Sequence, residues 1–255
     1  MSTEEIRRKI RNLSKDCRNA VDEYQTYGIY KHPSDYFKNS FDDFVSPRTK
    51  DGKLNSNDLD KIFSSKIMIL LQDWASCDKL DEIVNDPKKR EEKEFILEHG
   101  YSPNDFRKTN EKLNESIKKF PLELIGSEKE EKSYYITNIF PYLKPKVDSD
   151  IHQPDMDRAF KKFCWEEVKV IRPKVVICLG KRVYPTFLKN CLTLIKNKEI
   201  ESLISKESNT IPSFVLKLPK EEIFVYSLYH PAAWTGKRKF EDEWKELKKL
   251  LANPD

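Results

Sequence analysis

The sequence predicts an α/β fold in which a central, mainly parallel sheet of four strands lies between two layers of helices. Four short apolar runs have the length of strands, and amphipathic helical patterns separate them. Each run is hydrophobic almost throughout, which is typical of strands buried on both faces of a parallel sheet. Strands that alternate with helices predict right-handed crossovers and a three-layer αβα arrangement. The runs are residues 67–71, 134–137, 175–179 and 223–228.

The predicted helices show apolar residues at the spacing of one helix face. In residues 3–24, Ile6, Ile10 and Leu13 recur among charged residues, which predicts an amphipathic helix with a buried stripe. Three charge-rich stretches, 79–94, 127–132 and 194–207, predict exposed helix faces or loops. The later helical patterns cover 109–120, 155–171, 181–196 and 237–251.

The chain divides by its patterns into two parts. Residues 1–60 combine the first helix with an aromatic-rich segment that lacks sustained periodicity. We expect this N-terminal extension to be ordered and packed on the core, because a linker would be poor in aromatic residues. Residues 61–255 contain all four predicted strands and form the α/β domain.

Composition and charge limit the classes of function. Of the 255 residues, 38% are hydrophobic and 35% are charged, which predicts a folded protein with a highly charged surface. Residues 1–11 lack the apolar run of a signal peptide or membrane span, so we expect a cytoplasmic monomer with no membrane partner. A net charge of +4 permits nucleic-acid binding without demonstrating it. The five cysteines form no C-x-x-C pair, so we expect reduced thiols.

Polar residues follow each of the four predicted strands. Ligands of an open parallel sheet bind at the carboxyl ends of its strands, so these residues are the candidates for chemistry. They offer a carboxylate, an amide, a basic helix start and an imidazole. The segments are Gln72-Asp73-Trp74-Ala75-Ser76 after the first strand, Asn138 after the second, Gly180-Lys181-Arg182 after the third, and Tyr229-His230-Pro231 after the fourth.

These segments resemble the motifs of the uracil-DNA glycosylase superfamily. Gln72-Asp73 after a hydrophobic strand is similar to the first motif of that family. The Y-x-T-N sequence at 135–138 looks like its uracil-recognition strand, and His230-Pro231-Ala232 looks like its second catalytic motif. The sequence RPKVVICLG at 172–180 is similar to a strand of several branches. The resemblance covers about residues 65–250 and implies a hydrolase for base excision and DNA repair, with DNA as partner.

The chemistry that this resemblance implies needs opposite charges on two sides of one bond. Hydrolysis of an N-glycosidic bond creates positive charge on the sugar and negative charge on the departing base. An ionised Asp73 suits the sugar side, where it positions a water molecule. A neutral His230 suits the base side, where it donates a hydrogen bond to a base oxygen. Asn138 offers a donor and an acceptor to the edge of a pyrimidine.

Other residues are candidates for contact with DNA. Gly180-Lys181 lacks the pattern of a Walker loop and instead predicts a helix start that holds one phosphate. Base flipping leaves a gap in the duplex, and Trp234 is the candidate wedge that fills it. The basic run Lys237, Arg238 and Lys239 follows this tryptophan and is expected to bind the flanking phosphates.

The residues after Asp73 depart from the family pattern. In the best-known branch the first motif reads G-Q-D-P-Y-H, and its tyrosine excludes thymine by closing the space beside C5 of the pyrimidine. Here Ala75 stands in place of that tyrosine, and we expect Gln72, Trp74 and Ala75 to contact the base. The predicted substrate is therefore either uracil or a C5-modified pyrimidine. Hydroxymethylated or glycosylated pyrimidines of phage DNA would fit, with a role in antiviral defence.

No cofactor or metal ion is expected, and two alternative functions stay open. The cysteines lack the spacing of an iron–sulfur site, no H-E-x-x-H sequence occurs, and no G-x-G-x-x-G loop occurs. One alternative is a catalytically inactive DNA-binding relative. The other is a nucleotide-handling or protein-interaction module on the same fold. Release of a base from DNA would separate both from a glycosylase.

Overall fold

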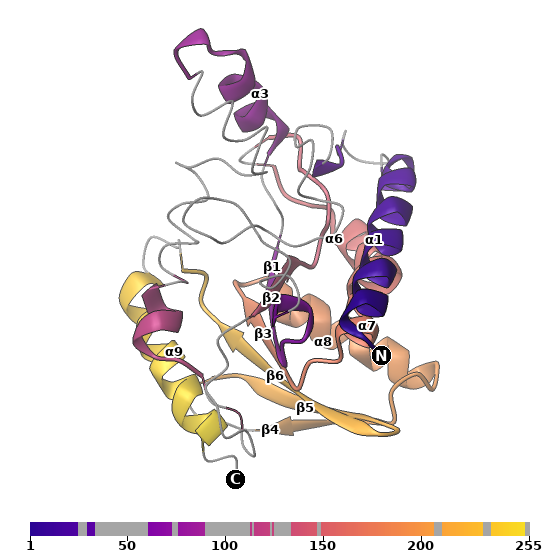
Figure 1. Ribbon diagram of the computed structural model, residues 1–255, viewed down its shortest axis with the longest axis vertical. Helices are drawn as coiled ribbons and strands as arrows, with labels where there is room; N and C mark the ends of the chain where they lie inside the picture. The colour runs from indigo at the N-terminus through magenta and orange to yellow at the C-terminus, as the bar shows by residue number, and fades with distance from the viewer. Residues whose placement is uncertain are drawn as a thin grey trace. The chain divides into compact units, whose positions relative to one another are not determined.

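The structure is a computed structural model, and its contacts divide the chain into two compact units. Unit 1 comprises residues 1–64, 72–106 and 136–172, and unit 2 comprises residues 65–71, 107–135 and 173–255. Most of the aromatic-rich segment at 25–60 lies outside the described residues. The structure describes residues 1–24, 30–33, 61–72, 76–89, 113, 115–122, 124, 134–146, 149–206, 211–231 and 236–252 (Figure 1).

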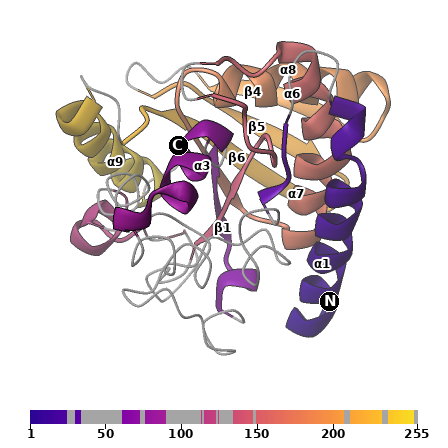
Figure 2. The ribbon, with the colours of Figure 1, turned by 90° about the horizontal axis from the view of Figure 1, so that it is seen from above.

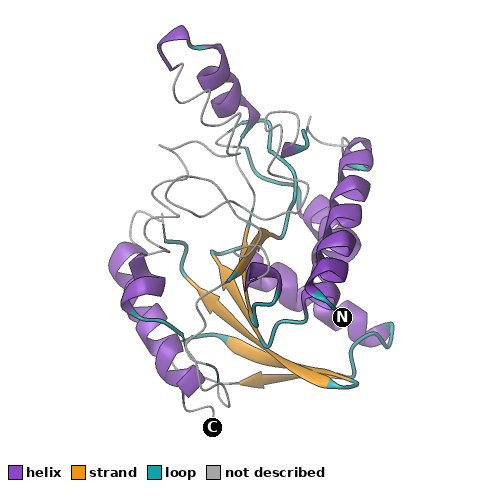
Figure 3. Ribbon diagram, in the orientation of Figure 1, coloured by secondary structure: helices purple, strands orange, loops and turns teal. Residues whose placement is uncertain are grey.

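The strands form one mixed sheet of six, two more than the sequence predicts, in the order β2-β1-β3-β6-β5-β4 (Figure 3). The α/β class is confirmed, and the four predicted strands are consecutive within this order. The strands are β1 (Ile67–Leu71), β2 (Tyr135–Asn138), β3 (Val175–Leu179), β4 (Ser202–Lys206), β5 (Ser213–Leu218) and β6 (Glu221–Leu228).

The parallel centre of unit 2 consists of β1, β3 and β6. Ile67 of β1 pairs with Val175 of β3, and Val175 pairs in turn with Phe224 of β6. All five residues of β3 are buried, which agrees with its continuous apolar sequence. Because the three strands run in the same direction, their carboxyl ends lie at one edge of the sheet.

Strands β4 and β5 form an antiparallel extension of the sheet. β4 corrects the prediction of a helix face or loop at 194–207 for residues 202–206, whereas residues 194–196 are helical and 197–201 lie in turns, as predicted. Ile204 of β4 pairs with Val215 of β5, and β5 pairs antiparallel with β6. β4 is the last strand in the order, so it has one neighbour, and only two of its five residues, Leu203 and Ile204, are apolar. A short edge strand of this kind carries a weaker hydrophobic signal than a central strand.

Among the described residues of unit 2, helices α8 (Val183–Lys196) and α9 (Gly236–Ala252) pack against the sheet. Helix α8 packs against β3 and β4, and the ring of its Tyr184 lies 5.4 Å from that of Phe214 on β5. Helix α9 packs against β6, and Figures 1 and 2 show it on the side of the sheet away from α8. The buried Trp244 fixes α9, because its indole N–H donates to the carbonyl of Phe120 at 3.0 Å.

Unit 1 contains most of the helices that the structure describes. Helix α1 (Thr3–Asn19) begins where the Ser2 side chain accepts from the N–H of Glu5, and it packs against α7. The Tyr142 hydroxyl donates to the carbonyl of Cys17 at 2.9 Å and so joins α1 to the segment after β2. The other elements are η1 (Val21–Tyr24), α3 (Cys77–Asn85), η3 (Pro87–Lys89), α6 (Gln153–Ala159), η4 (Phe160–Cys164), which is a π-helical turn, and α7 (Trp165–Ile171).

Among the described residues, none of the helices has both the length and the apolar sequence needed to cross a membrane.

Candidate active site

In unit 1, Asn138 occupies the end of β2 and is almost fully buried, with 5% of its surface exposed. The preceding Thr137 hydroxyl lies 3.1 Å from the carboxylate of Glu167 on α7, and both residues are buried. Successive side chains of a strand point to opposite faces, so Asn138 lies on the face away from Glu167. The hydrogen bond fixes the strand immediately before the amide that the sequence assigns to base recognition.

The segment after β1 is tied to the segment after β2, again within unit 1. The N–H of Phe140 donates to the carbonyl of Gln72 at 3.0 Å. Further along, the N–H of Cys77 donates to the carbonyl of Lys144 at 2.7 Å, next to a parallel bridge between Ser76 and Lys144. Gln72 is half-buried. The residues on both sides of 73–75 are thereby fixed against the chain that follows Asn138.

Several predicted site residues lie outside the part of the chain that the structure describes. They are Asp73, Trp74, Ala75 and Trp234, together with the side chains of Lys237 and Arg238. Their assignments stay predictions.

In unit 2, Gly180 lies against His230. Gly180 follows β3 with a φ of 100°, and its N–H donates to the carbonyl of Leu228 at 2.9 Å. A Cβ at Gly180 would lie 3.6 Å from the Cβ of His230. The sequence had assigned Gly180 to phosphate binding. The structure adds that this glycine supports the turn that carries the histidine.

Two side chains of α9, Lys239 and Glu243, form hydrogen bonds with Tyr229. The N–H of Tyr229 donates to Oε2 of Glu243 at 2.6 Å. The Lys239 ammonium donates to the Tyr229 hydroxyl at 3.0 Å and lies 4.5 Å from the centre of its ring. Burial raises the pKa of the Glu243 carboxyl, and the Tyr229 N–H and the Lys239 charge oppose that rise. The hydrogen bond to Tyr229 raises the pKa of Lys239.

Sequence reasoning places Tyr229 among the candidates after the fourth strand but misses Glu243 and its contact with Tyr229. The only signal was the spacing of Lys239 and Glu243, which are four residues apart on one helix face. Lys181 is exposed just before α8, as a phosphate contact requires. Lys239 is also exposed, and its ammonium has three donors, of which Tyr229 uses one.

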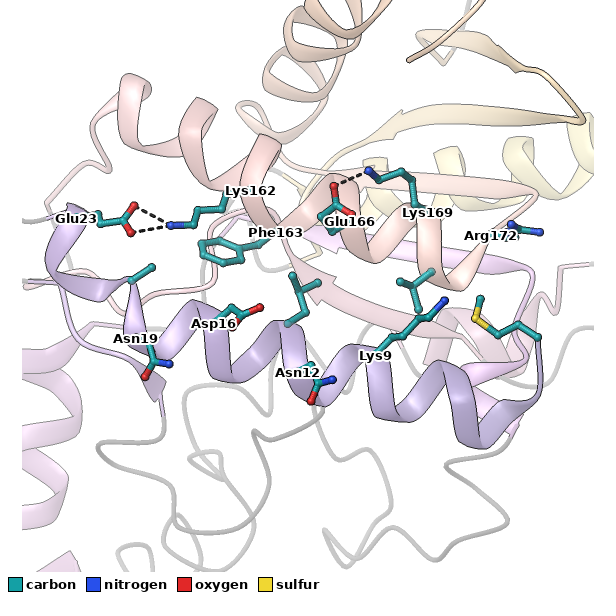
Figure 4. A pocket seen from close by; sticks show the side chains of 14 residues that line it. Lys9, Asn12, Asp16, Asn19, Glu23, Lys162, Phe163, Glu166, Lys169 and Arg172 are labelled. Atoms are coloured by element: carbon teal, nitrogen blue, oxygen red, sulfur yellow. Dashed lines mark hydrogen bonds and ion pairs between the residues drawn. The ribbon is translucent and has the colours of Figure 1, made fainter. Parts of the chain in front are cut away.

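A groove of about 840 Å³ lies in unit 1 between α1 and the helices η4 and α7 (Figure 4). Two ion pairs lie along its walls, Lys162 with Glu23 at 2.7 Å and Lys169 with Glu166. Lys9, Asp16 and Arg172 also line the groove, so charges of both signs face it and it offers no single-sign surface to a ligand. None of its lining residues is a predicted site residue.

The described residues contain no group of three His, Cys, Asp or Glu side chains able to hold a metal ion. Each of the five cysteines is a buried free thiol. Burial raises the pKa of Cys178 far above its usual range, so this thiol stays protonated.

Comparison with known families gives the class of protein. The family model described as Uracil DNA glycosylase superfamily matches residues 74–251, which is more than half of the chain. The protein therefore belongs to the uracil-DNA glycosylase superfamily. Its members are generally DNA glycosylases, so the family indicates a function of that type, acting on DNA. The comparison with curated proteins finds no match.

The first prediction concerns Gly180. Because a side chain at its positive φ is strained, Gly180→Ala is expected to lower the free energy of unfolding by about 1–2 kcal/mol. Urea denaturation measures this change. Lys181→Ala, at the exposed neighbouring position, is the control and should change stability by less than about 0.5 kcal/mol. Equal stability of Gly180→Ala and the wild type would contradict the strained backbone.

Proposed function

We propose that the protein is a monofunctional DNA glycosylase that hydrolyses the N-glycosidic bond of a flipped-out pyrimidine. Water, rather than a lysine amine, is the nucleophile. The observation that carries this proposal is the position of the polar motifs, which directly follow or end strands of the sheet in a chain of this superfamily. Gln72 follows β1, Asn138 ends β2, Gly180 follows β3, and His230 follows β6 by two residues.

Asp73 and His230 divide the charge of the transition state between them. The Asp73 carboxylate positions the attacking water and stabilises positive charge on the sugar. The His230 imidazole donates a hydrogen bond to the base oxygen on which negative charge develops. Support for this role comes from the fixed surroundings of His230, because both Gly180 and the residue before the histidine are held by hydrogen bonds.

Asn138 reads the edge of the base, and Gln72 contacts the same base. A buried amide at the end of a fixed strand keeps one orientation, which favours discrimination between hydrogen-bonding patterns. Trp74 and Ala75 complete the walls beside the base. With alanine in place of the family tyrosine, the space beside C5 stays open, so the substrate is uracil or a pyrimidine enlarged at C5.

Basic side chains and one tryptophan provide the contacts with DNA. Lys181, Lys237, Arg238 and Lys239 neutralise phosphates, with the backbone of Gly180 beside the first of them. Trp234 enters the gap left by the flipped nucleotide.

The test of the function is base release. The protein is incubated with duplex and single-stranded DNA that carries uracil, thymine, 5-hydroxymethylcytosine or glucosylated hydroxymethylcytosine, and mass spectrometry identifies the free bases. Release of any base supports the glycosylase. Binding of DNA without release from any substrate would support an inactive DNA-binding relative instead.

The second prediction concerns catalysis. Asp73→Asn and His230→Ala each remove one charge partner of the same transition state, so each should lower the single-turnover rate by ~10²-fold or more. DNA affinity, measured by fluorescence anisotropy, should stay close to that of the wild type. Unchanged rates in both variants would exclude the assignment.

The third prediction concerns binding to the DNA phosphates. Replacing Lys181, Lys237, Arg238 and Lys239 one at a time by alanine should weaken binding to every DNA sequence equally. Each lost phosphate contact should lower the slope of log affinity against log salt by about one. Glu246→Ala on α9 is the control, since this residue forms an ion pair with Lys249 at 3.3 Å and carries no assigned contact with DNA. A loss limited to one sequence would indicate base readout.

The fourth prediction concerns the space beside C5 of the bound base. Ala75→Tyr should suppress release of a C5-modified pyrimidine more than release of uracil, because the new ring fills the space beside C5. Ala75→Ser, which is nearly as small, is the matched control and should preserve the wild-type order of substrates. Efficient release of uracil by the wild type, with every C5-modified pyrimidine ignored, would refute the open pocket.

A further inference from the structure

The peptide group between Leu228 and Tyr229 is held at both of its polar atoms. Its carbonyl accepts from the N–H of Gly180 at 2.9 Å, and its N–H donates to Glu243 at 2.6 Å. A peptide group is planar, so two hydrogen bonds at opposite ends fix the orientation of the whole plane. The first contact comes from the end of β3 and the second from α9.

The acceptor in this arrangement is itself rigid. Glu243 precedes Trp244, which is fully buried and is bonded to the carbonyl of Phe120 at 3.0 Å. The half-buried carboxylate therefore stands on a helix that is anchored at the adjacent residue. Lys239, one turn earlier on α9, holds the Tyr229 side chain through its hydroxyl and its ring.

Only two backbone rotations, the φ and ψ of Tyr229, separate this fixed plane from the next peptide group, which ends at the Cα of His230. On the other side Pro231 restricts the backbone of the preceding residue to extended conformations. The backbone of His230 is therefore restricted on one side by the hydrogen-bonded Leu228–Tyr229 peptide and on the other by Pro231. Gly180 lies next to the Cβ of His230.

We infer that Glu243 is a positioning residue. By accepting the hydrogen bond of the Tyr229 N–H, it holds the Leu228–Tyr229 peptide and thereby fixes the orientation of the backbone at His230, just after β6. This inference rests on the proposed function for its catalytic consequence, although the positioning itself does not require activity. A small displacement of a group that acts in the transition state lowers the rate strongly while binding is retained.

Three variants on α9 separate positioning from general stability. Glu243→Ala removes the acceptor of the Tyr229 N–H. Glu243→Gln keeps an acceptor oxygen at the same place without the charge. Asp242→Ala is the matched control, because Asp242 is an exposed neighbour that forms an ion pair with Lys245 at 3.7 Å and, within the described part of the chain, makes no hydrogen bond with Tyr229. Thermal unfolding of all three variants establishes that they are folded.

The first readout is independent of activity. In the full-length protein labelled with ¹³C-histidine, the imidazole signal of His230 is assigned by its loss in His230→Gln. Glu243→Ala should shift or broaden this signal and speed hydrogen exchange of the Tyr229 amide by about 10-fold or more. Glu243→Gln and Asp242→Ala should resemble the wild type. An unchanged His230 signal and unchanged exchange in Glu243→Ala would overturn the inference.

The second readout is the single-turnover rate of base release against DNA concentration. Glu243→Ala should lower the maximal rate by about 10-fold with the half-saturating DNA concentration unchanged, and Glu243→Gln should restore most of the rate. If an active wild type and Glu243→Ala release base equally fast, the positioning role is wrong. If the wild type releases no base, the proposed function fails, and the His230 signal alone decides the inference.

Discussion

The parallel pairing of β3 with β1 and β6 is the constraint on which unit 2 depends. It requires long connections between these strands, and the connection from β3 to β6 contains α8 and the antiparallel strands β4 and β5. It also brings the carboxyl ends of three strands to one edge. The polar motifs that follow the strands therefore begin from a common framework of backbone hydrogen bonds.

The same framework explains how a single histidine can be held firmly on a turn. Gly180 reaches the carbonyl of Leu228 because β3 and β6 are neighbours, and its positive φ is accessible because it has no side chain. Glu243 reaches the other end of that peptide because α9 packs against β6. The orientation of His230 is thus a consequence of sheet pairing and helix packing together.

Unit 1 supports Asn138 by a different means, a buried polar contact. Glu167 is 2% exposed and accepts from Thr137, and the Tyr142 hydroxyl reaches the carbonyl of Cys17. Buried polar groups are costly without partners, so such contacts favour one arrangement of the surrounding helices and strand. Ligands of open parallel sheets bind at the carboxyl ends of the strands, and the residue proposed to read the base, Asn138, ends β2.

The sequence by itself determined the central strands, because a strand buried on both faces must be apolar along its whole length. The limits of β1 and β3 agree with the predicted runs at 67–71 and 175–179. The motifs at 72–73, 138 and 230 likewise followed from their places after these runs. Only the tertiary structure revealed the β4–β5 extension and the contact of Glu243 with Tyr229. An edge strand needs little apolar sequence, and a hydrogen bond between residues fourteen positions apart depends on how α9 packs on β6, which no local pattern encodes.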